Sequence, residues 1–440
     1  MLSARETALR ALISFRREGA WPDLYLKKAC ADMRSEEAAL ASTITYGVLQ
    51  NRAYLDFLLG KLSARPLEKI TPQVLDALRL GAYQLVFLTR IPHSAAVNET
   101  VELVKKTANA AAAGYANGVL RSLQRSLDDL PQVPREKELD YLSIRYSHPK
   151  WFAGKMNKRL GFAGCEALLQ ANNTPVPVTA RVNTLKTTRE ELLLRFAQEG
   201  ISAVPHPNLP NAIVFDSMKG VLQSDLLQQG LFYIQDVASQ LCVEALQPKP
   251  GETVFDLCAA PGGKSMLVAQ MMEDTGRLLS MDIHPHKSDL IAKNAKTYGI
   301  TCLQTIPSDA SKLREPLVEQ ADAIVCDVPC SGMGVIRKKP DVRYKDGDQI
   351  KVLPPLQLSI LENAGKYLKP GGRVVYSTCT VLKEENESVV QQFLDAHPDF
   401  TLEPFDLPGI GRVEEGMLTL WPHIHGTDGF FMAKLRKSRG

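Results

Sequence analysis

Five short apolar runs between residues 253 and 377 constrain the fold of this chain more than any other feature. Segments with the apolar spacing of amphipathic helices follow three of them, at 264–273, 286–299 and 354–368. The runs are TVFDL, LLSMD, LQTI, AIVCD and RVVYS. Such alternation is typical of a parallel sheet covered by helices on both faces. We therefore expect an α/β domain here, with DGFFMAKLRK near the end of the chain as an antiparallel edge strand.

The preceding sequence has two other patterns. From Ser3 to about Ser126, apolar residues recur at three- and four-residue spacing, which predicts a helical domain that ends at the proline-rich segment 130–138. Strand-like VTARVNTL and NAIVFD then flank helix-like REELLLRFAQEG, which indicates a small α+β domain. The predicted division is 1–138, 139–230 and 231–440.

Composition and cysteine spacing exclude several classes of protein. The chain has no apolar run of about 18 residues, so no membrane span is predicted, and its charged start favours a cytoplasmic protein. Its 8 cysteines form no C-x-x-C pair, which argues against a zinc site, and we expect no metal. Basic residues outnumber acidic ones up to residue 240 and the reverse holds afterwards. This asymmetry favours an anionic partner for the first part.

The predicted cofactor site follows the first three strands, because open parallel sheets bind ligands beyond the carboxyl ends of their strands. DLCAAPGGKS at 256–265 places two glycines at a strand-to-helix turn, without the spacing of a dinucleotide or Walker A loop. Asp282 ends the second strand and suits a ribose diol. Asp309 follows the third and suits an adenine amino group. This order indicates S-adenosylmethionine; the alternative is that each aspartate only caps a turn.

Two cysteines, Cys330 and Cys379, follow the fourth and fifth strands. C5 of cytosine attacks a methyl sulfonium only after a thiolate has added to C6, and the product is released when the C5 proton leaves, for which a second thiol is suited. Lys264 is a candidate for the positive charge that lowers a thiol pKa. Asp327 is a candidate partner for the N3–N4 edge of cytosine. The alternative is that both cysteines are inert core residues.

These motifs resemble a known family. DLCAAPGGKS, DVPCSG and STCTVLKEENE are similar to the RNA cytosine-C5 methyltransferases that use two cysteines, as are YIQDVASQ and DGFFMAKLRK. HSAAVNETVELVKK and GYANGVLRSL resemble a NusB-like helical domain, and YSHPKW and RVNTLK resemble the linking region of such enzymes. Over nearly its whole length the chain resembles the RsmB (Sun/Fmu) family of bacterial 16S ribosomal RNA methyltransferases.

The resemblance implies an all-α NusB-like N-terminal domain, a small α+β linking domain and a Rossmann-like methyltransferase domain. It implies 16S ribosomal RNA as the substrate, Cys379 as the nucleophile and Cys330 as the thiol that aids release. It assigns the cofactor pocket to Cys258, Ala259, Ala260, Pro261, Gly262, Gly263, Lys264, Asp282, Asp309 and Asp327.

Two other functions remain as alternatives to methylation of 16S ribosomal RNA. One is a tRNA cytosine-C5 methyltransferase, and the other is a non-enzymatic RNA-binding factor. The basic loop after Cys330 is expected to contact RNA phosphates through Arg337, Lys338, Lys339 and Arg343, which positions RNA without reading its sequence. We expect a monomer and no membrane partner.

Overall fold

The computed structural model describes residues 2–19 and 21–439. It forms two compact units, Met1–Thr174 with Lys339–Lys345, and Pro175–Lys338 with Asp346–Gly440. Within the described ranges no helix combines the length and apolar character needed to cross a membrane.

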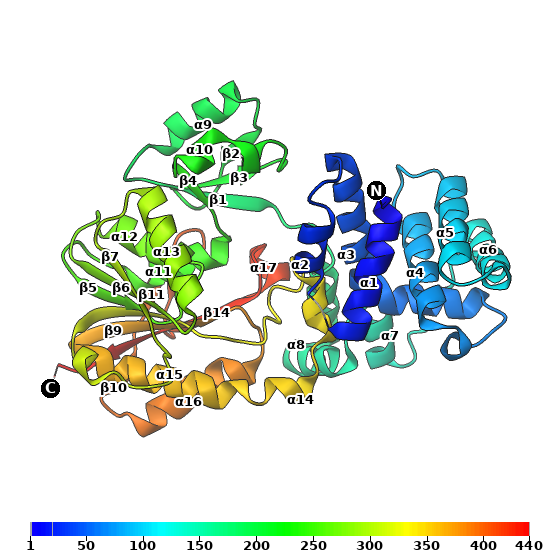
Figure 1. Cartoon of the computed structure of the whole chain (residues 1–440). Coiled ribbons are helices and arrows are strands. Elements are labelled where there is room, and N and C mark those ends of the chain that lie inside the picture. Colours follow the sequence, from blue (N-terminus) through cyan, green and yellow to red (C-terminus); the bar gives the residue numbers. More distant parts are fainter. Residues whose placement is uncertain (1, 20, 440) are drawn as a thin grey trace. The chain divides into compact units, whose positions relative to one another are not determined.

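The first unit is all helical, as the apolar spacing predicts. Its long helix α3 has a buried stripe that includes Leu55, Leu58 and Leu59, which recur at helical spacing. The helices, blue to cyan-green in Figure 1, are α1 Ala4–Glu18, α2 Pro22–Ala29, α3 Ser35–Leu62, α4 Pro72–Phe87, α5 His93–Thr107, α6 Ala110–Arg125, α7 Glu138–Arg145 and α8 Lys150–Ala171, with short 3₁₀ turns at Leu67–Lys69 and Pro340–Tyr344. α7 and α8 belong to this same compact unit. The domain edge expected at 138 stays a prediction.

A segment from far along the chain, 339–345, completes the first unit. Arg343 in this segment is buried, and its Nη1 donates to the carbonyl oxygens of Gln50 at 2.6 Å and Ser147 at 2.8 Å. Its Nη2 donates to Asn173 Oδ1 at 3.1 Å. Tyr344 donates its hydroxyl to the carbonyl oxygen of Leu49 at 2.7 Å. Buried backbone acceptors need such donors, so this segment is an integral part of the helical unit.

The second unit begins with a four-stranded sheet in the order β2–β3–β1–β4. Phe196, Phe215 and Phe232 pack edge to face in its core. Its elements are β1 Val178–Val182, α9 Arg189–Gln198, β2 Ala203–Pro205, β3 Ala212–Phe215, a 3₁₀ turn Val221–Gln223, α10 Asp225–Gln228 and β4 Phe232–Ile234. The small α+β domain is confirmed, and its edge at 230 stays a prediction.

The larger sheet of this unit follows the order β10–β14–β9–β8–β5–β6–β7, with β13 also paired to β14. The five strands predicted from the apolar runs pair in parallel. The parallel strands are β5 Thr253–Asp256, β6 Arg277–Asp282, β7 Leu303–Pro307, β8 Ala321–Asp327 and β9 Leu368–Thr378. The later strands are β10 Phe400–Leu402, β11 Phe405–Leu407, β12 Gly411–Val413, β13 Met417–Leu420 and β14 Phe430–Lys437. This is the Rossmann-like arrangement expected.

The final strand differs in one respect from the prediction. β14 is antiparallel to β9, as expected, but it is not an edge strand, because β10 pairs with its other side. After α16 Glu387–Ala396 the chain returns to the sheet through the three residues of β10, a run too short for sequence periodicity to predict.

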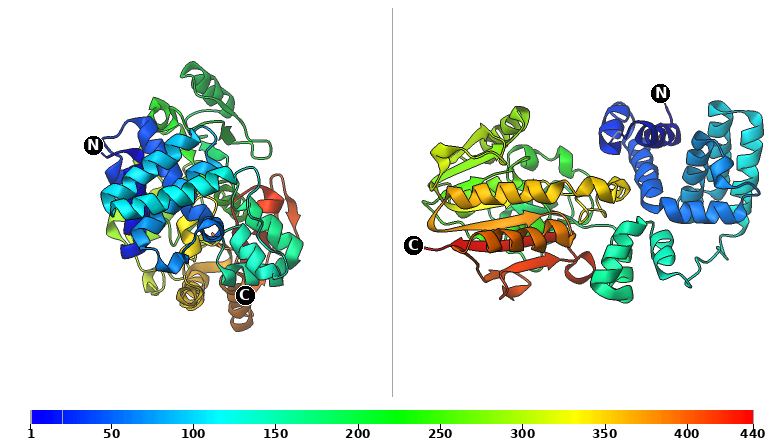
Figure 2. Two further views of the ribbon diagram at one scale, coloured as in Figure 1. Left: turned by 90° about the vertical axis from the view of Figure 1, so that its right-hand side faces the viewer. Right: turned by 90° about the horizontal axis from the view of Figure 1, so that it is seen from below.

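Helices cover both faces of this sheet because successive strand residues point to opposite sides. Val254 packs in one core, with residues from α11, α12 and α13, and Phe255 packs in the other, with α15 and α16 (Figure 1). Figure 2 shows α15 lying against β8 and β9. The helices are α11 Val237–Leu246, α12 Gly263–Met271, α13 Pro285–Tyr298, α14 Gly347–Ile350, α15 Leu353–Tyr367, α16 Glu387–Ala396 and α17 Pro422–His425, with 3₁₀ turns Glu315–Leu317 and Lys383–Glu385.

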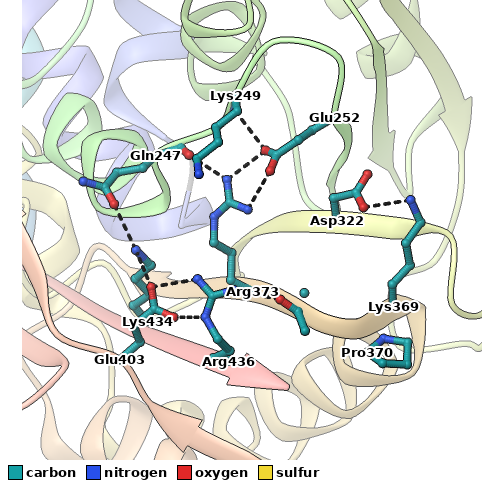
Figure 3. A pocket seen from close by; sticks show the side chains of 12 residues that line it. Gln247, Lys249, Glu252, Asp322, Lys369, Pro370, Arg373, Glu403, Lys434 and Arg436 are labelled. Atoms are coloured by element: carbon teal, nitrogen blue, oxygen red, sulfur yellow. Dashed lines mark hydrogen bonds and ion pairs between the residues drawn. The ribbon is translucent and has the colours of Figure 1, made fainter. Parts of the chain in front are cut away.

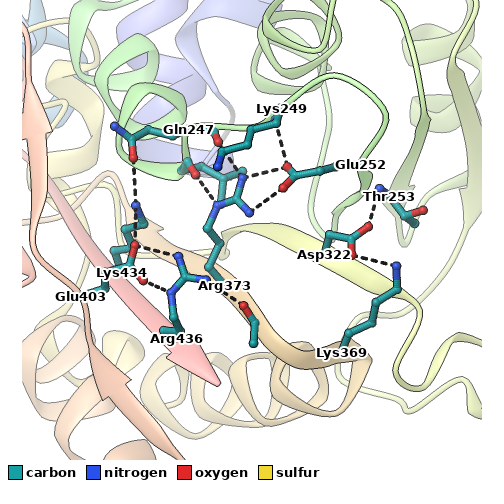
Figure 4. A network of polar contacts seen from close by, with 12 residues as sticks. Gln247, Lys249, Glu252, Thr253, Asp322, Lys369, Arg373, Glu403, Lys434 and Arg436 are labelled. Atoms are coloured by element: carbon teal, nitrogen blue, oxygen red, sulfur yellow. Dashed lines mark hydrogen bonds and ion pairs between the residues drawn. The ribbon is translucent and has the colours of Figure 1, made fainter. Parts of the chain in front are cut away.

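An ion-pair network holds the amino-terminal edge of this sheet. Arg373, at the start of the regular part of β9, forms a two-bond pair with Glu252 at 2.8 and 2.9 Å. Lys434 and Arg436 of β14 share Glu403, and Lys369 pairs with Asp322 at 2.8 Å. These side chains line a cavity of about 240 Å³ (Figure 3). Figure 4 shows the same network extending to Gln247 and to the backbone of Thr253. None of the predicted site residues lines this cavity.

Candidate active site

The turn after β5 adopts the conformation that its glycines permit. Gly262 has a φ of +100°, which other residues rarely adopt, and α12 begins at Gly263. A Cβ atom on Gly263 would lie 3.0 Å from a ring carbon of Tyr233. Gly262 is therefore required by its backbone conformation, and a side chain at 263 would crowd Tyr233.

The two predicted cofactor aspartates cap turns beyond neighbouring strands. Asp282 Oδ1 accepts the backbone N–H of His284 at 3.0 Å, and Asp309 Oδ1 accepts both the N–H and the hydroxyl of Ser311. The hydroxyl bond is the main cause that lowers the pKa of Asp309. One oxygen of each carboxylate, Oδ1, thus caps a turn, as the alternative interpretation of these aspartates holds. These turns do not use Oδ2, which at Asp309 lies 3.6 Å from the exposed Lys312 Nζ, so each carboxylate retains acceptor capacity for a hydroxyl or amino group.

Cys258 lies between these acids. Burial raises the pKa of its thiol first, and the charges of Asp256, Asp327, Asp282 and Asp309 raise it further. A buried thiol near several carboxylates has a small thiolate fraction and is therefore a poor nucleophile. The position therefore fits a role in the shape of the turn better than a role in catalysis.

Lys264 and Asp327 are direct partners. Lys264 Nζ lies 2.7 Å from Asp327 Oδ2, and the hydroxyl of Ser377 donates to Oδ1 at 2.8 Å. Burial alone would lower the pKa of Lys264, but the charge of Asp327 outweighs it and keeps the pKa raised. Lys264 therefore stays charged beside the strand ends.

The two thiols meet at the carboxyl ends of β8 and β9. Cys330 Sγ and Cys379 Sγ are 3.1 Å apart. The hydrogen bond from Cys330 is the main cause that lowers the pKa of Cys379, against burial, and the charge of Lys264 adds to it. The same bond raises the pKa of Cys330 well above its ordinary value. Of the two sulfurs, Cys379 is therefore the one that ionises first.

A buried turn after Cys379 fixes both thiol segments, and the sequence reasoning gave it no role. Glu385 Oε2 accepts the backbone N–H of Ser331 at 2.8 Å and the amide of Gln357 at 2.9 Å. The Gln357 amide also donates to the carbonyl oxygen of Pro329 at 2.9 Å. Cys330 is therefore held on both sides. The signal available in the sequence is the acidic pair followed by asparagine in LKEEN, directly after the second cysteine motif.

The same turn holds the Cys379 segment through Asn386. The hydroxyl of Thr378 donates to Asn386 Oδ1 at 2.6 Å, and Asn386 Nδ2 donates to the carbonyl oxygen of Thr380 at 3.0 Å. The hydroxyls of Ser331 and Thr380 are 2.9 Å apart and link the two segments directly. Local hydrogen bonds from two neighbouring residues thus set the sulfur–sulfur distance.

The predicted phosphate contacts need a correction. Arg343 is buried among backbone acceptors of the helical unit, so the expectation that it contacts RNA is wrong. Lys338 pairs with Asp236 at 2.6 Å and Asp428 at 2.7 Å, and Arg337 donates to the carbonyl oxygen of Thr427. Lys339 is exposed, as a phosphate contact requires. A cluster of basic residues in the sequence does not show which side chains face solvent and which bind carboxylates or carbonyl oxygens within the protein.

Comparison with known proteins identifies the family of this chain. The model of the 16S rRNA methyltransferase RsmB/F family matches residues 243–436. The NusB family model matches residues 2–125, and that of the RsmF/B-like ferredoxin-like domain matches residues 148–221. The crystal structure of PH0851 covers 99% of this chain and 99% of that chain, with 27% identity and a TM-score of 0.79. The structure of NSun6 from Pyrococcus horikoshii with SFG covers 66% of this chain and 99% of that one, with 24% identity and a TM-score of 0.59.

Curated relatives match over the full length. The probable ribosomal RNA small subunit methyltransferase B of Bacillus subtilis is 39% identical over 99% of each chain, and that of Synechocystis is 32% identical over 100% of each. The fold and site define an S-adenosylmethionine-dependent methyltransferase with a NusB-type helical domain. The chain belongs to the ribosomal RNA small subunit methyltransferase B family.

Proposed function

We propose that this enzyme methylates C5 of a cytosine in 16S ribosomal RNA through a covalent bond between Cys379 and C6. The observation that carries the proposal is the 3.1 Å sulfur–sulfur contact, with the pKa of Cys379 lowered and that of Cys330 raised. A methyltransferase that acts on an exocyclic nitrogen needs no thiol, whereas a pyrimidine carbon does.

The cofactor fits the strand ends described above. Asp282 would hold the ribose hydroxyls and Asp309 the adenine amino group, beside the backbone of Gly262 and Gly263. S-adenosylmethionine supplies an electrophilic methyl group. In line with this assignment, NSun6 of Pyrococcus horikoshii was solved with SFG.

The protein's own groups would act in sequence. The Cys379 thiolate gives its electron pair to C6, and the electron pair of the C5–C6 double bond moves to C5. C5 would then take the methyl group, whose bond to the sulfonium sulfur breaks and leaves a neutral thioether. Asp327, held by Lys264, faces the N3–N4 edge of cytosine. Once Cys379 is a neutral thioether, the hydrogen bond that most raises the Cys330 pKa is gone, while burial and the charges of Glu385 and Asp327 still raise it. Cys330 then gives up its proton to solvent more readily than before. Its thiolate then removes the C5 proton, and the bond from C6 to Cys379 breaks.

Transfer of labelled methyl groups tests this proposal. The enzyme is incubated with methyl-labelled S-adenosylmethionine and an unmodified 16S RNA transcript, and the RNA is digested to nucleosides. We expect label in 5-methylcytidine from 16S RNA and none when a tRNA pool replaces it. Label in another nucleoside, or in tRNA alone, would overturn the proposal.

A further inference from the structure

A second cavity lies in the catalytic unit. It measures about 580 Å³, within the roughly 300–1,000 Å³ of pockets that hold small ligands. Its walls come from the small sheet, the start of α11, the loop after β11 and α17. The walls include the apolar side chains of Val237, Leu241, Ile410 and Ile424 beside several polar groups. We call it the His206–His425 cavity, after two imidazoles that line it.

Both imidazoles are held in one tautomer by the backbone. Nδ1 of His206 accepts the N–H groups of Asn208 and Leu209, at 3.2 and 3.1 Å. Nδ1 of His425 accepts the N–H of Trp421 at 2.8 Å. A nitrogen that accepts cannot carry the proton, so the hydrogen of each neutral ring lies on Nε2. Burial lowers the pKa of both rings, which favours the neutral form.

Each Nε2–H is therefore a donor without a partner among the described residues. Two fixed neutral donors on apolar walls suit a flat ligand with acceptor atoms on its edge. They suit a phosphate poorly, because neither ring is charged and the carboxylate of Asp236 also lines the cavity. Unpaired nucleobases have such edges, and proteins bind them by stacking and by hydrogen bonds to those edges.

Backbone hydrogen bonds connect the cavity to the nucleophile. Thr427 lines the cavity, and two residues further on Gly429 donates its N–H to the carbonyl oxygen of Gly334 at 2.9 Å. Gly334 in turn donates its N–H to the carbonyl oxygen of Cys379 at 3.0 Å. An RNA strand whose cytosine reaches Cys379 would thus pass close to this cavity.

We propose that the His206–His425 cavity binds an unstacked nucleobase that neighbours the target cytosine in the RNA strand. The inference rests on the proposed RNA substrate and adds a second base-binding site to it. The two histidine donors read acceptors on the edge of that base, and the apolar walls cover its faces. The enzyme thereby holds two bases out of the stack and recognises more than the base it modifies.

Photo-crosslinking tests where the RNA lies. An unmodified 16S transcript containing 4-thiouridine is irradiated with the full-length enzyme, and cross-linked peptides are identified by mass spectrometry. We expect nucleotide adducts within residues 206–214 or 421–427. Adducts confined to other segments would overturn the proposal.

Matched variants test the two donors. In His206→Asn and His425→Asn, an amide oxygen replaces Nδ1 as the backbone acceptor, whereas the Nε2–H donor is lost. We expect each change to raise the Kd for the transcript about three- to tenfold, the effect of one neutral hydrogen bond. The control is His423→Asn, on the same short helix but outside the cavity lining. S-adenosylmethionine affinity and thermal unfolding report whether each variant is folded.

The Kd measurement needs no methyl transfer, so it distinguishes failure of this inference from failure of the proposed reaction. If both variants bind the transcript as tightly as His423→Asn does, the cavity holds no base. If label reaches no cytosine but the variants weaken binding, the reaction proposal fails and the cavity assignment stands.

Discussion

At the scale of single residues, the two sulfurs act as one acid–base pair. One proton between two thiols 3.1 Å apart makes one sulfur more acidic and the other less so, and the charge of Lys264 favours the thiolate at Cys379. Neither cysteine would have these properties alone at the end of a strand.

The first prediction concerns thiol reactivity. With less than one equivalent of iodoacetamide near pH 8, we expect alkylation of Cys379 before Cys330, because the lowered pKa increases the thiolate fraction. Peptide mass mapping measures the two rates. In Cys330→Ala the hydrogen bond is absent, so the pH midpoint of Cys379 alkylation should move upward. Equal rates in the native protein would contradict the described pair.

The second prediction separates the two roles. Cys330→Ala should leave the bond from Cys379 to RNA in place, because no thiol removes the C5 proton, and should give a covalent complex on denaturing gels. Cys379→Ser should abolish both methyl transfer and the complex, since a hydroxyl is a far weaker nucleophile. Free turnover by Cys330→Ala without any complex would show that the roles are wrong.

At the scale of elements, the short turn Lys383–Glu385 with Asn386 determines where two strand ends meet. In Glu385→Ala, the N–H of Ser331 and the amide of Gln357 lose their buried acceptor, at about 1–3 kcal/mol for each group. We expect the free energy of unfolding to fall by about 3 kcal/mol in urea titrations, with methyl transfer strongly reduced. Glu385→Gln keeps an acceptor and should retain more of both. Lys383→Ala, on the exposed side of the turn, is the control and should change neither.

The network at the opposite edge of the sheet makes a prediction about acid stability. Burial alone would raise the pKa of Glu403, but hydrogen bonds from Arg436 and Lys434 lower this pKa to about 2. An unfolded glutamate titrates at about 4.3. The stabilisation by this carboxylate is thus complete above about pH 4.3 and is lost as the pH falls toward 2. Unfolding midpoints of Glu403→Gln should depend less on pH in this window than those of the native chain.

The parallel strands and the residues at their ends could be predicted from the sequence because both follow local rules. A buried strand needs a continuous apolar run, and the loops beyond parallel strands meet at one edge of the sheet. The pairing of β10 with β14 and the roles of Glu385 and Gln357 depend on contacts between distant segments. No spacing within the sequence encodes those contacts. Arg343 shows the same limit, since its partners lie in the first half of the chain.

At the scale of the whole molecule, the helical unit is discontinuous in sequence. A chain ending at Thr174 would lack Arg343 and Tyr344, which bond buried carbonyl oxygens of Leu49, Gln50 and Ser147. We expect this truncated chain to unfold at a lower temperature than the helical unit in the intact protein, by several degrees. A peptide of residues 337–347 added in excess should restore part of the difference. A peptide with Leu in place of Arg343 should not.

This discontinuity limits how such enzymes can be recombined. In a fusion that exchanges only the first 174 residues for those of a relative, the helices of the relative would contact the native segment 339–345. Any working chimera must carry both pieces from the same parent, so the transferable module is defined by two separate stretches of the gene.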